Sequence, residues 1–103
     1  MNRKIISDLN VRGDSCNKRI CASYARLVEI LGEPFKSDEH NYPDDNDKTD
    51  VCWRVTFEDS DDGGLAVWNY KNGPNYCGDG SVEDIEDWSC FVYGDGSEIL
   101  DML

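Results

Sequence analysis

The sequence predicts a small α+β fold: an antiparallel sheet of about five strands, one main helix packed on one face, and a short C-terminal helix. Residues 23–34 show helical periodicity with a start signal and a stop signal. Residues 51–58 and 64–71 alternate apolar and polar side chains on either side of an acidic turn, and residues 88–94 form a third strand-like stretch. Consecutive antiparallel strands combined with one helix are typical of the α+β class.

The N-terminal part is expected to form a hairpin. Residues 5–12 alternate loosely and end at Gly13 and Asp14, which favour a turn. Residues 18–22 are then the expected returning strand.

Residues 23–34 carry the clearest local signal. Ser23 is a suitable N-cap, Gly32 suits the left-handed position after the last turn, and Pro34 prevents continuation. The apolar residues between them fall at i, i+3, i+4 and i+7 and form one face: Tyr24, Leu27, Val28 and Leu31.

The central hairpin is predicted from two alternating stretches. The first strand should have one face on the core and one towards solvent. Its core face consists of Val51, Trp53, Val55 and Phe57. Trp53 and Trp68 should lie on neighbouring antiparallel strands, joined by a turn at Gly63 and Gly64. Near the C-terminus, Ser97 is the expected N-cap of a short helix that docks on the sheet.

The charge is unevenly distributed along the chain. Residues 1–35 hold six basic and four acidic residues, a net charge of +2, whereas residues 36–103 hold four basic and 18 acidic residues, a net charge of −14. Together they give the net charge of −12. Such a negative field repels nucleic acid and speeds association with cationic partners. We therefore expect a basic protein partner, no direct binding of nucleic acid and no binding to membranes.

The five cysteines predict neither a disulfide framework nor a zinc site, because their number is odd and no Cys-x-x-Cys pair occurs. Cys52 and Cys90 fall inside predicted strands, where a reduced cysteine acts as a small hydrophobic residue. Cys16 and Cys21 could lie across a turn from each other, where air would oxidise them. The N-terminal residues lack the apolar run of a signal peptide. We expect one acidic domain over residues 1–103, in the cytosol, with all five thiols reduced.

Three motifs, in this order, resemble one protein family. The motifs are SYARLVEILGEP (23–34), WRVTFEDSDDGGLAVWNYK (53–71) and WSCFVYG (88–94). They resemble small phage and viral proteins in which a Ser-Tyr-x-x-Leu helix closed by Gly-x-Pro precedes Trp-containing and aromatic strands. The resemblance covers residues 6–96, and this sequence differs in a longer acidic turn and two acidic loops. It implies a phage or viral accessory protein in the host cytoplasm without an assigned enzymatic role, and it supplies no active-site residues.

No residue pattern predicts catalysis. The one histidine, His40, lies in a polar loop beside Asp38 and Glu39, with no serine or cysteine in a nucleophile motif. Neither acidic stretch, 44–50 or 58–64, combines a glycine at the sixth position with the closing glutamate at the twelfth that an EF-hand requires: counted from Asp59, Gly64 is sixth but Tyr70 is twelfth. This leaves weak, adventitious cation binding as the alternative. We expect no enzymatic activity, no cofactor and no dedicated metal site.

The acidic residues form three groups that could bind a basic partner. They are the loop cluster (Asp44, Asp45, Asp47 and Asp50), the hairpin cluster (Glu58, Asp59, Asp61 and Asp62) and the C-terminal cluster (Glu83, Asp84, Glu86 and Asp87). Carboxylates on strands and loops can approximate the spacing of phosphates along a nucleic-acid strand. Neighbouring carboxylates also repel one another, so selection for a basic partner would explain why the turn tolerates them.

Two functions are consistent with this pattern. The first is a non-enzymatic inhibitor that mimics nucleic acid and occupies the basic groove of a host nucleic-acid-handling protein, such as a CRISPR or restriction nuclease. The alternative is a virion or accessory structural module whose acidity serves solubility only. Salt distinguishes them, because an electrostatic complex weakens steeply as ionic strength rises.

Overall fold

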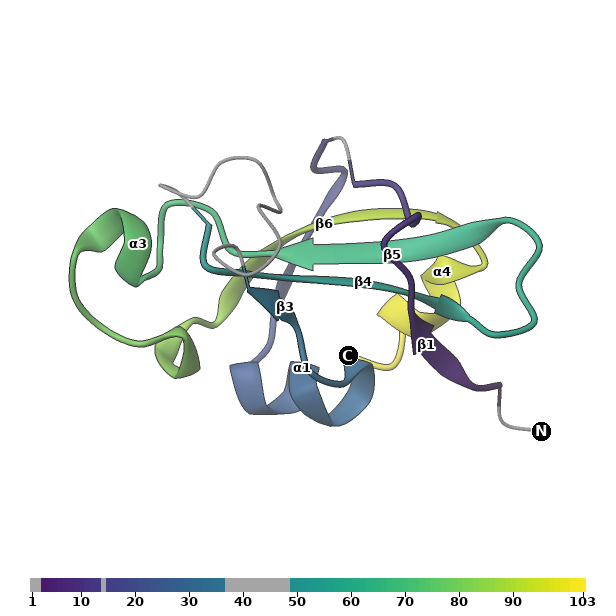
Figure 1. The fold of residues 1–103 in the computed structure, drawn as a ribbon, viewed down its shortest axis with the longest axis horizontal. Helices are drawn as coiled ribbons and strands as arrows, with labels where there is room; N and C mark the ends of the chain where they lie inside the picture. Colours follow the sequence, from purple (N-terminus) through teal and green to yellow (C-terminus); the bar gives the residue numbers. More distant parts are fainter. Residues whose placement is uncertain (1–2, 14, 37–48) are drawn as a thin grey trace.

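The computed structural model describes residues 3–13, 15–36 and 49–103. This part of the chain forms an antiparallel sheet of six strands: β1 (Ile5–Ser7), β2 (Lys18–Cys21), β3 (Phe35–Lys36), β4 (Val51–Phe57), β5 (Gly63–Trp68) and β6 (Asp87–Gly94). The main helix is α1 (Tyr24–Leu31), and α4 (Gly96–Leu100) lies at the C-terminus (Figure 1). The short α3 (Pro74–Cys77) and the 3₁₀ helix η1 (Val82–Asp84) precede β6. The predicted small antiparallel sheet with a main helix and a short C-terminal helix is confirmed, and β3 is an additional short strand.

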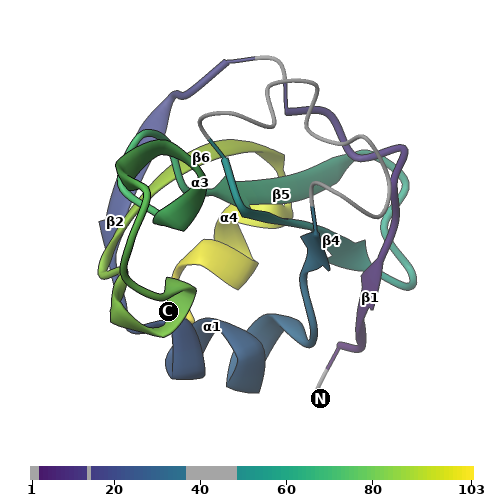
Figure 2. The same cartoon turned by 60° about the vertical axis from the view of Figure 1, so that its left-hand side comes forward.

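The order of strands in the sheet is β1-β4-β5-β6-β2, with β3 beside β4. β1 and β2 therefore lie on opposite sides of the central strands, and the predicted N-terminal hairpin is wrong. The chain between them crosses the sheet, as Figure 2 shows. Burial of Val11 holds this crossing segment (residues 8–13) in place, because its side chain packs directly on Gly64. The hydrophobic contact outweighs the local turn signal at Gly13.

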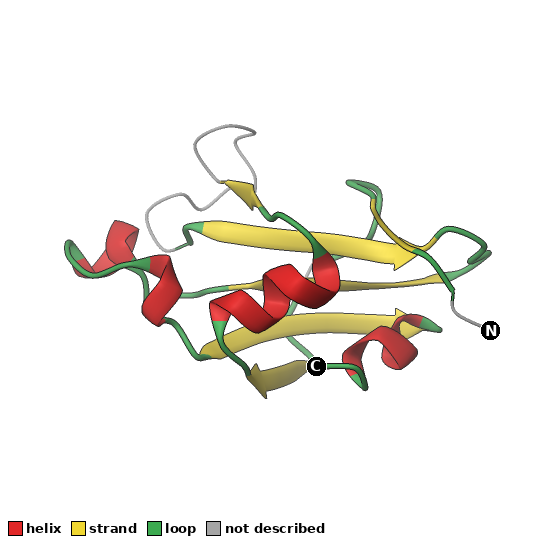
Figure 3. Ribbon diagram, turned by 90° about the horizontal axis from the view of Figure 1, so that it is seen from below, coloured by secondary structure: helices red, strands yellow, loops and turns green. Residues whose placement is uncertain are grey.

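The core lies between the sheet and the helices. Trp53 of β4 and Trp88 of β6 are almost fully buried and meet edge to face, with ring centroids 5.3 Å apart. Their indole nitrogens donate to backbone carbonyls on either side of α1, Trp53 to Gly32 at 2.7 Å and Trp88 to Ala22 at 2.8 Å. Figures 1 and 2 show α1 and α4 on the same side of the sheet, and Figure 3 shows α1 from below, in front of the strands.

Helix α1 begins and ends at the predicted residues. The Ser23 hydroxyl accepts a hydrogen bond from the Arg26 backbone N–H at 3.1 Å, as an N-cap does. Gly32 has a φ of 88°, and its N–H donates to the Val28 carbonyl. Leu27 on the apolar face is fully buried.

Strand β4 is buried on both faces, whereas the sequence predicts one solvent face. Cys52 and Thr56 on the second face are 1% and 9% exposed. The crossing segment covers this face: the Arg54 guanidinium donates to the Val11 carbonyl, and a Cβ atom added to Gly13 would lie 2.8 Å from Arg54 Nη2. Alternation therefore identified the strand correctly, but it could not show that a distant segment covers the polar side.

Two glycines predicted to form the hairpin turn instead belong to β5. Gly63 pairs with Gly94, and Gly64 pairs with Tyr93. A Cβ atom on Gly96 of α4 would overlap the Gly64 carbonyl oxygen, so the helix can approach the strand only because Gly96 lacks a side chain. These glycines serve close packing between β5, β6 and α4.

The N-cap of α4 is Asp95, not Ser97 as the sequence predicts. Ser97 lies inside the helix, and its hydroxyl donates to the Gly94 carbonyl at 3.4 Å. Ile99 is fully buried in the core cluster, so this helix docks on the sheet as expected.

Candidate functional site

Two members of the hairpin cluster form ion pairs within the chain. Arg3 Nη2 lies 2.9 Å from Asp59 Oδ1, and Lys4 Nζ lies 3.6 Å from Glu58 Oε2. Arg3 also contacts two acidic residues near α4, Asp95 at 2.8 Å and Glu98 at 3.2 Å. The N-terminal basic residues therefore compensate part of the negative charge at this end of the sheet.

Arg3 is fixed by more than its charge. Its guanidinium carbon lies 3.9 Å from the centroid of the Phe57 ring, so a ring and three carboxylates surround it. Hydrogen bonds to Asp95 and Asp59 raise the pKa of Arg3. Hydrogen bonds from Arg3 and then Ser60 lower the pKa of Asp95, which therefore stays ionised further into the acid range.

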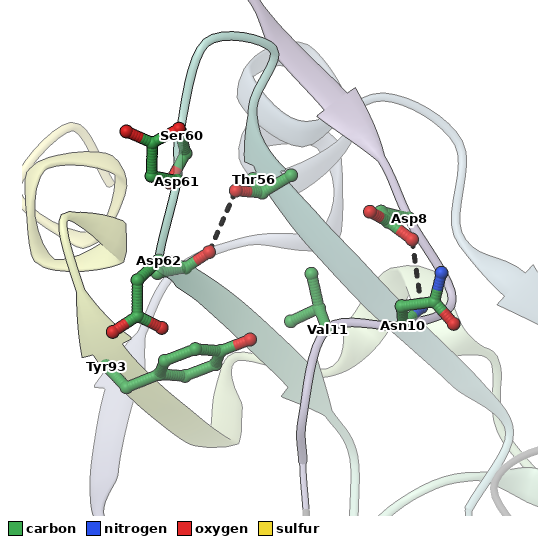
Figure 4. A pocket seen from close by; sticks show the side chains of 9 residues that line it. Asp8, Asn10, Val11, Thr56, Ser60, Asp61, Asp62 and Tyr93 are labelled. Atoms are coloured by element: carbon green, nitrogen blue, oxygen red, sulfur yellow. Dashed lines mark hydrogen bonds between the residues drawn. The ribbon is translucent and has the colours of Figure 1, made fainter.

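The other two members of the hairpin cluster, Asp61 and Asp62, line a shallow pocket with a volume of about 170 Å³ (Figure 4). Asp8 and Tyr93 lie on its other sides. Asp61 and Asp62 are exposed and form no ion pair with the described residues. Within residues 3–13, 15–36 and 49–103, no group of three or more His, Cys, Asp or Glu side chains has a metal-binding arrangement.

The C-terminal cluster lies at the opposite end of the sheet, from η1 to the first residue of β6 (Figure 1). Glu83 and Asp84 belong to η1, whose N-cap Ser81 accepts a hydrogen bond from the Glu83 N–H. Glu83, Asp84 and Glu86 are exposed, and none forms an ion pair in the part of the chain that the structure describes. Asp87 alone is paired, with Arg19 Nη2 at 2.5 Å. This cluster is the less compensated of the two.

The loop cluster is only partly described. Asp44, Asp45 and Asp47 lie outside the described residues, as does His40. Asp50 accepts a hydrogen bond from the Asn69 side-chain amide at 2.9 Å, and Asn69, fully buried, in turn accepts from the Asp50 backbone N–H at 2.9 Å. Asp50 therefore helps to fix the start of β4.

The structure does not bring the two described clusters together. The molecule measures 42 × 23 × 23 Å, and the hairpin and C-terminal clusters lie towards opposite ends of its long sheet (Figure 1). A basic groove would therefore meet either one cluster or both ends of an elongated body. β4 and β6 lie on either side of β5 and run in the same direction, so the end of β4 and the start of β6 lie at opposite ends of the sheet. The sequence could not show this, because it does not give the order of the strands.

Among the described residues, the hydrogen bonds of the cysteine thiols go to backbone carbonyls and not to a base. Cys52 and Cys90 are buried, and burial raises the pKa of each thiol to about 12, so both remain protonated at neutral pH. Cys16 and Cys21 are exposed but do not face each other across a turn, because the extended strand β2 separates them by about 10 Å or more. That separation exceeds the reach of a disulfide, which is about 7 Å between Cα atoms.

A further surface was missed at the level of the sequence. Phe91 and Tyr93 of β6 alternate with the core residues Trp88 and Cys90, and they lie on the opposite face of the sheet with ring centroids 5.6 Å apart. Their alternation was visible in the sequence. The sequence did not show whether other segments cover these two side chains.

Comparisons with protein families, with curated proteins and with solved structures found no match to this chain. The resemblance to phage and viral proteins therefore stays a prediction. Within residues 3–13, 15–36 and 49–103, none of the helices has the length and apolar character needed to cross a membrane.

Proposed function

We propose that this chain is a non-enzymatic phage or viral accessory protein that acts in the host cytoplasm as an acidic inhibitor. It would mimic nucleic acid and dock on the basic surface of a host nucleic-acid-handling protein, with a CRISPR or restriction nuclease as the type of target. Neither a cofactor nor a metal is part of this proposal.

The observation that carries the proposal is that three carboxylates of the C-terminal cluster are exposed and without an ion pair among the described residues. Glu83, Asp84 and Glu86 are exposed within four residues of each other and have no ion-pair partner among the described residues. Like charges held this close repel one another, and no basic side chain in residues 3–13, 15–36 or 49–103 forms an ion pair with these three, as Arg3 does with Asp59 at the hairpin. A basic partner would supply the missing positive charge.

The hairpin cluster contributes less to the proposed interface. Glu58 and Asp59 are paired within the chain, so a partner would have to compete with Lys4 and Arg3 for them. Asp61 and Asp62 remain available at the rim of their pocket. We therefore assign the main contact to the C-terminal cluster and a secondary contact to Asp61 and Asp62.

The test is inhibition of a purified RNA-guided nuclease and a purified restriction nuclease of the host. The variant Glu83→Lys/Asp84→Lys/Glu86→Lys should abolish inhibition, because it places repulsive charges against a basic groove. Asp61→Lys/Asp62→Lys should weaken it less. Inhibition by the native protein should also fall steeply between low and high salt.

The matched control, Glu29→Lys/Glu33→Lys/Asp101→Lys, changes the net charge by the same amount as the first triple variant. Its three residues lie in or next to α1 and α4, outside the C-terminal cluster. This variant should keep most of the inhibition if position matters. Equal loss in both triple variants would indicate a general charge effect. Unchanged binding at low salt in both variants would favour the structural module, in which acidity serves solubility only.

A further inference from the structure

The face of the sheet opposite the core carries a row of partly exposed aromatic side chains that the acidic clusters do not explain. Trp68 of β5 pairs with Ser89 of β6, so Phe91, two residues further along β6, is its diagonal neighbour. Tyr93 continues the row. Tyr70, just beyond β5, is 45% exposed. The crossing segment covers the β4 part of this face, but the aromatic side chains on β5 and β6 stay partly exposed, as is typical of a surface that binds a partner.

A hollow with a volume of about 340 Å³ lies at one end of this row. Its walls are formed by Cys16, Arg19, Trp68, Tyr70 and Ser89. The two aromatic side chains give it apolar walls, and the space is sufficient for an apolar side chain of a partner. Arg19, one of the lining residues, is paired with Asp87 and hydrogen-bonded to the Ser89 hydroxyl, so the hollow also has a polar side.

The positively charged side chain of Arg12 lies at the other end of the row. The guanidinium carbon of Arg12 is 4.4 Å from the Tyr93 ring centroid and 5.9 Å from that of Phe91. Stacking on the rings holds a guanidinium in place while its N–H groups stay available for hydrogen bonds. Arg12 is exposed, and its guanidinium forms no ion pair with any residue of 3–13, 15–36 or 49–103.

The lack of an ion pair between Arg12 and any described carboxylate is informative because acidic residues outnumber lysines and arginines by 22 to ten in the sequence. Arg3, Arg19 and Arg26 each contact at least one carboxylate within the chain. Arg12 instead stacks on aromatic rings, and no carboxylate in the described part of the chain pairs with its N–H donors.

We propose that this aromatic face (Arg12, Arg19, Trp68, Phe91 and Tyr93) binds an extended segment of a partner protein that presents a carboxylate to Arg12 and an apolar side chain to the hollow. The geometry sets the spacing. Phe91 and Tyr93 lie about 7 and 13 Å along β6 from Ser89, which is the length of two and four extended residues. The carboxylate and the apolar side chain should therefore be two or four residues apart. This proposal does not rest on the inhibitor function.

Charge favours a protein segment over single-stranded nucleic acid, which would also combine anions with flat apolar groups. A nucleic-acid strand long enough to cross this face would continue towards the hairpin cluster or the C-terminal cluster, whose carboxylates repel its phosphates. A segment with a single carboxylate is neutralised by Arg12 and avoids both ends.

The test uses two short peptides, acetyl-Glu-Ser-Leu-Ser-Leu-amide and its glutamine counterpart. NMR titration of the native protein should shift backbone amides of residues 12, 89, 91 and 93, with the glutamate peptide binding about fivefold more tightly. In Arg12→Gln the two peptides should bind equally. Tyr70→Ala should weaken both peptides and keep the preference for glutamate.

The matched control is Arg26→Gln, which removes an exposed arginine of α1 and should leave the preference unchanged. The proposal is overturned if native protein binds the two peptides equally, if neither binds at millimolar concentration, or if the shifts lie on another surface. Tighter binding of an eight-nucleotide thymidine strand at residues 12, 89 and 91 would also overturn it, in favour of nucleic acid.

Discussion

The hairpin cluster and the C-terminal cluster contain four acidic residues each, but they differ in how many of these form ion pairs within the chain. At the hairpin end, Arg3 and Lys4 reach residues more than fifty positions away and pair with Glu58, Asp59, Asp95 and Glu98. At the end between α3 and β6, Arg19 pairs with Asp87 and leaves Glu83, Asp84 and Glu86 without an ion pair in the described chain. Two carboxylates of the hairpin cluster are paired within the fold and two are not, whereas only one of the four in the C-terminal cluster is paired.

This difference shows that the local density of acidic residues does not measure the charge available to a partner. Carboxylates at the hairpin contribute to the attachment of the N-terminus, and their removal should cost stability. Glu83, Asp84 and Glu86 of the C-terminal cluster have no ion pair in the described chain and repel one another, so removing their charges should not lower stability. Substitutions at the two ends should therefore differ in their effect on stability.

The largest loss of stability is expected for a substitution in the core between the two ends. Leu27 is fully buried in the cluster that contains both tryptophans, so Leu27→Ala should lower the free energy of unfolding by about 2–5 kcal/mol. Urea unfolding followed by tryptophan fluorescence measures this loss. Val28→Ala, at a half-buried position of the same helix, should cost less. An unchanged midpoint in Leu27→Ala would show that α1 does not pack as described.

The next largest effect is expected from Arg3→Ala. The substitution removes three carboxylate contacts and the contact with the Phe57 ring at once. The urea midpoint at neutral pH should fall, by less than in Leu27→Ala. Lys4→Ala is the matched control, because it removes a neighbouring charge with one long contact of 3.6 Å to an exposed partner, and its midpoint should hardly move. Equal effects of the two substitutions would break the comparison between the ends.

Local features were predictable from the sequence, and long-range ones were not. Helix α1 was predicted correctly because Ser23, the apolar spacing and Gly32 all lie within ten residues. The pairing of β2 with β6 was missed because the crossing segment that separates it from β1 is fixed by contact between Val11 and Gly64, which are far apart in the chain. The acidic clusters are visible in the sequence, but their pairing is not, because Arg3 and Lys4 lie more than fifty positions before the hairpin that they compensate.

The contribution of Arg3 should depend on pH through Asp95. Hydrogen bonds from Arg3 and Ser60 lower the pKa of Asp95, so ionised Asp95 is favoured in the folded state. The resulting stability is present above the unfolded pKa of about 3.9 and is lost as pH falls through the lower folded pKa. The difference in urea midpoint between native protein and Arg3→Ala should therefore be largest at pH 6–7 and shrink below about pH 4. A difference that grows on acidification would contradict the role given to this ion pair.

The smallest expected effect is at the C-terminal cluster, and its sign is what matters. Glu83→Gln/Asp84→Asn/Glu86→Gln removes three exposed charges that have no ion pair in the described chain, so stability should stay within about 0.5 kcal/mol of the native value or rise slightly. Because salt screens the same repulsion, adding salt should raise the urea midpoint of the native protein more than that of this variant. Asp59→Asn at the hairpin provides the contrast, since it removes a partner of Arg3 and should lower the midpoint. If the triple variant were also less stable than the native protein, and most so at low salt, the C-terminal cluster would be held by attractive contacts, and its charge would not be free for a partner.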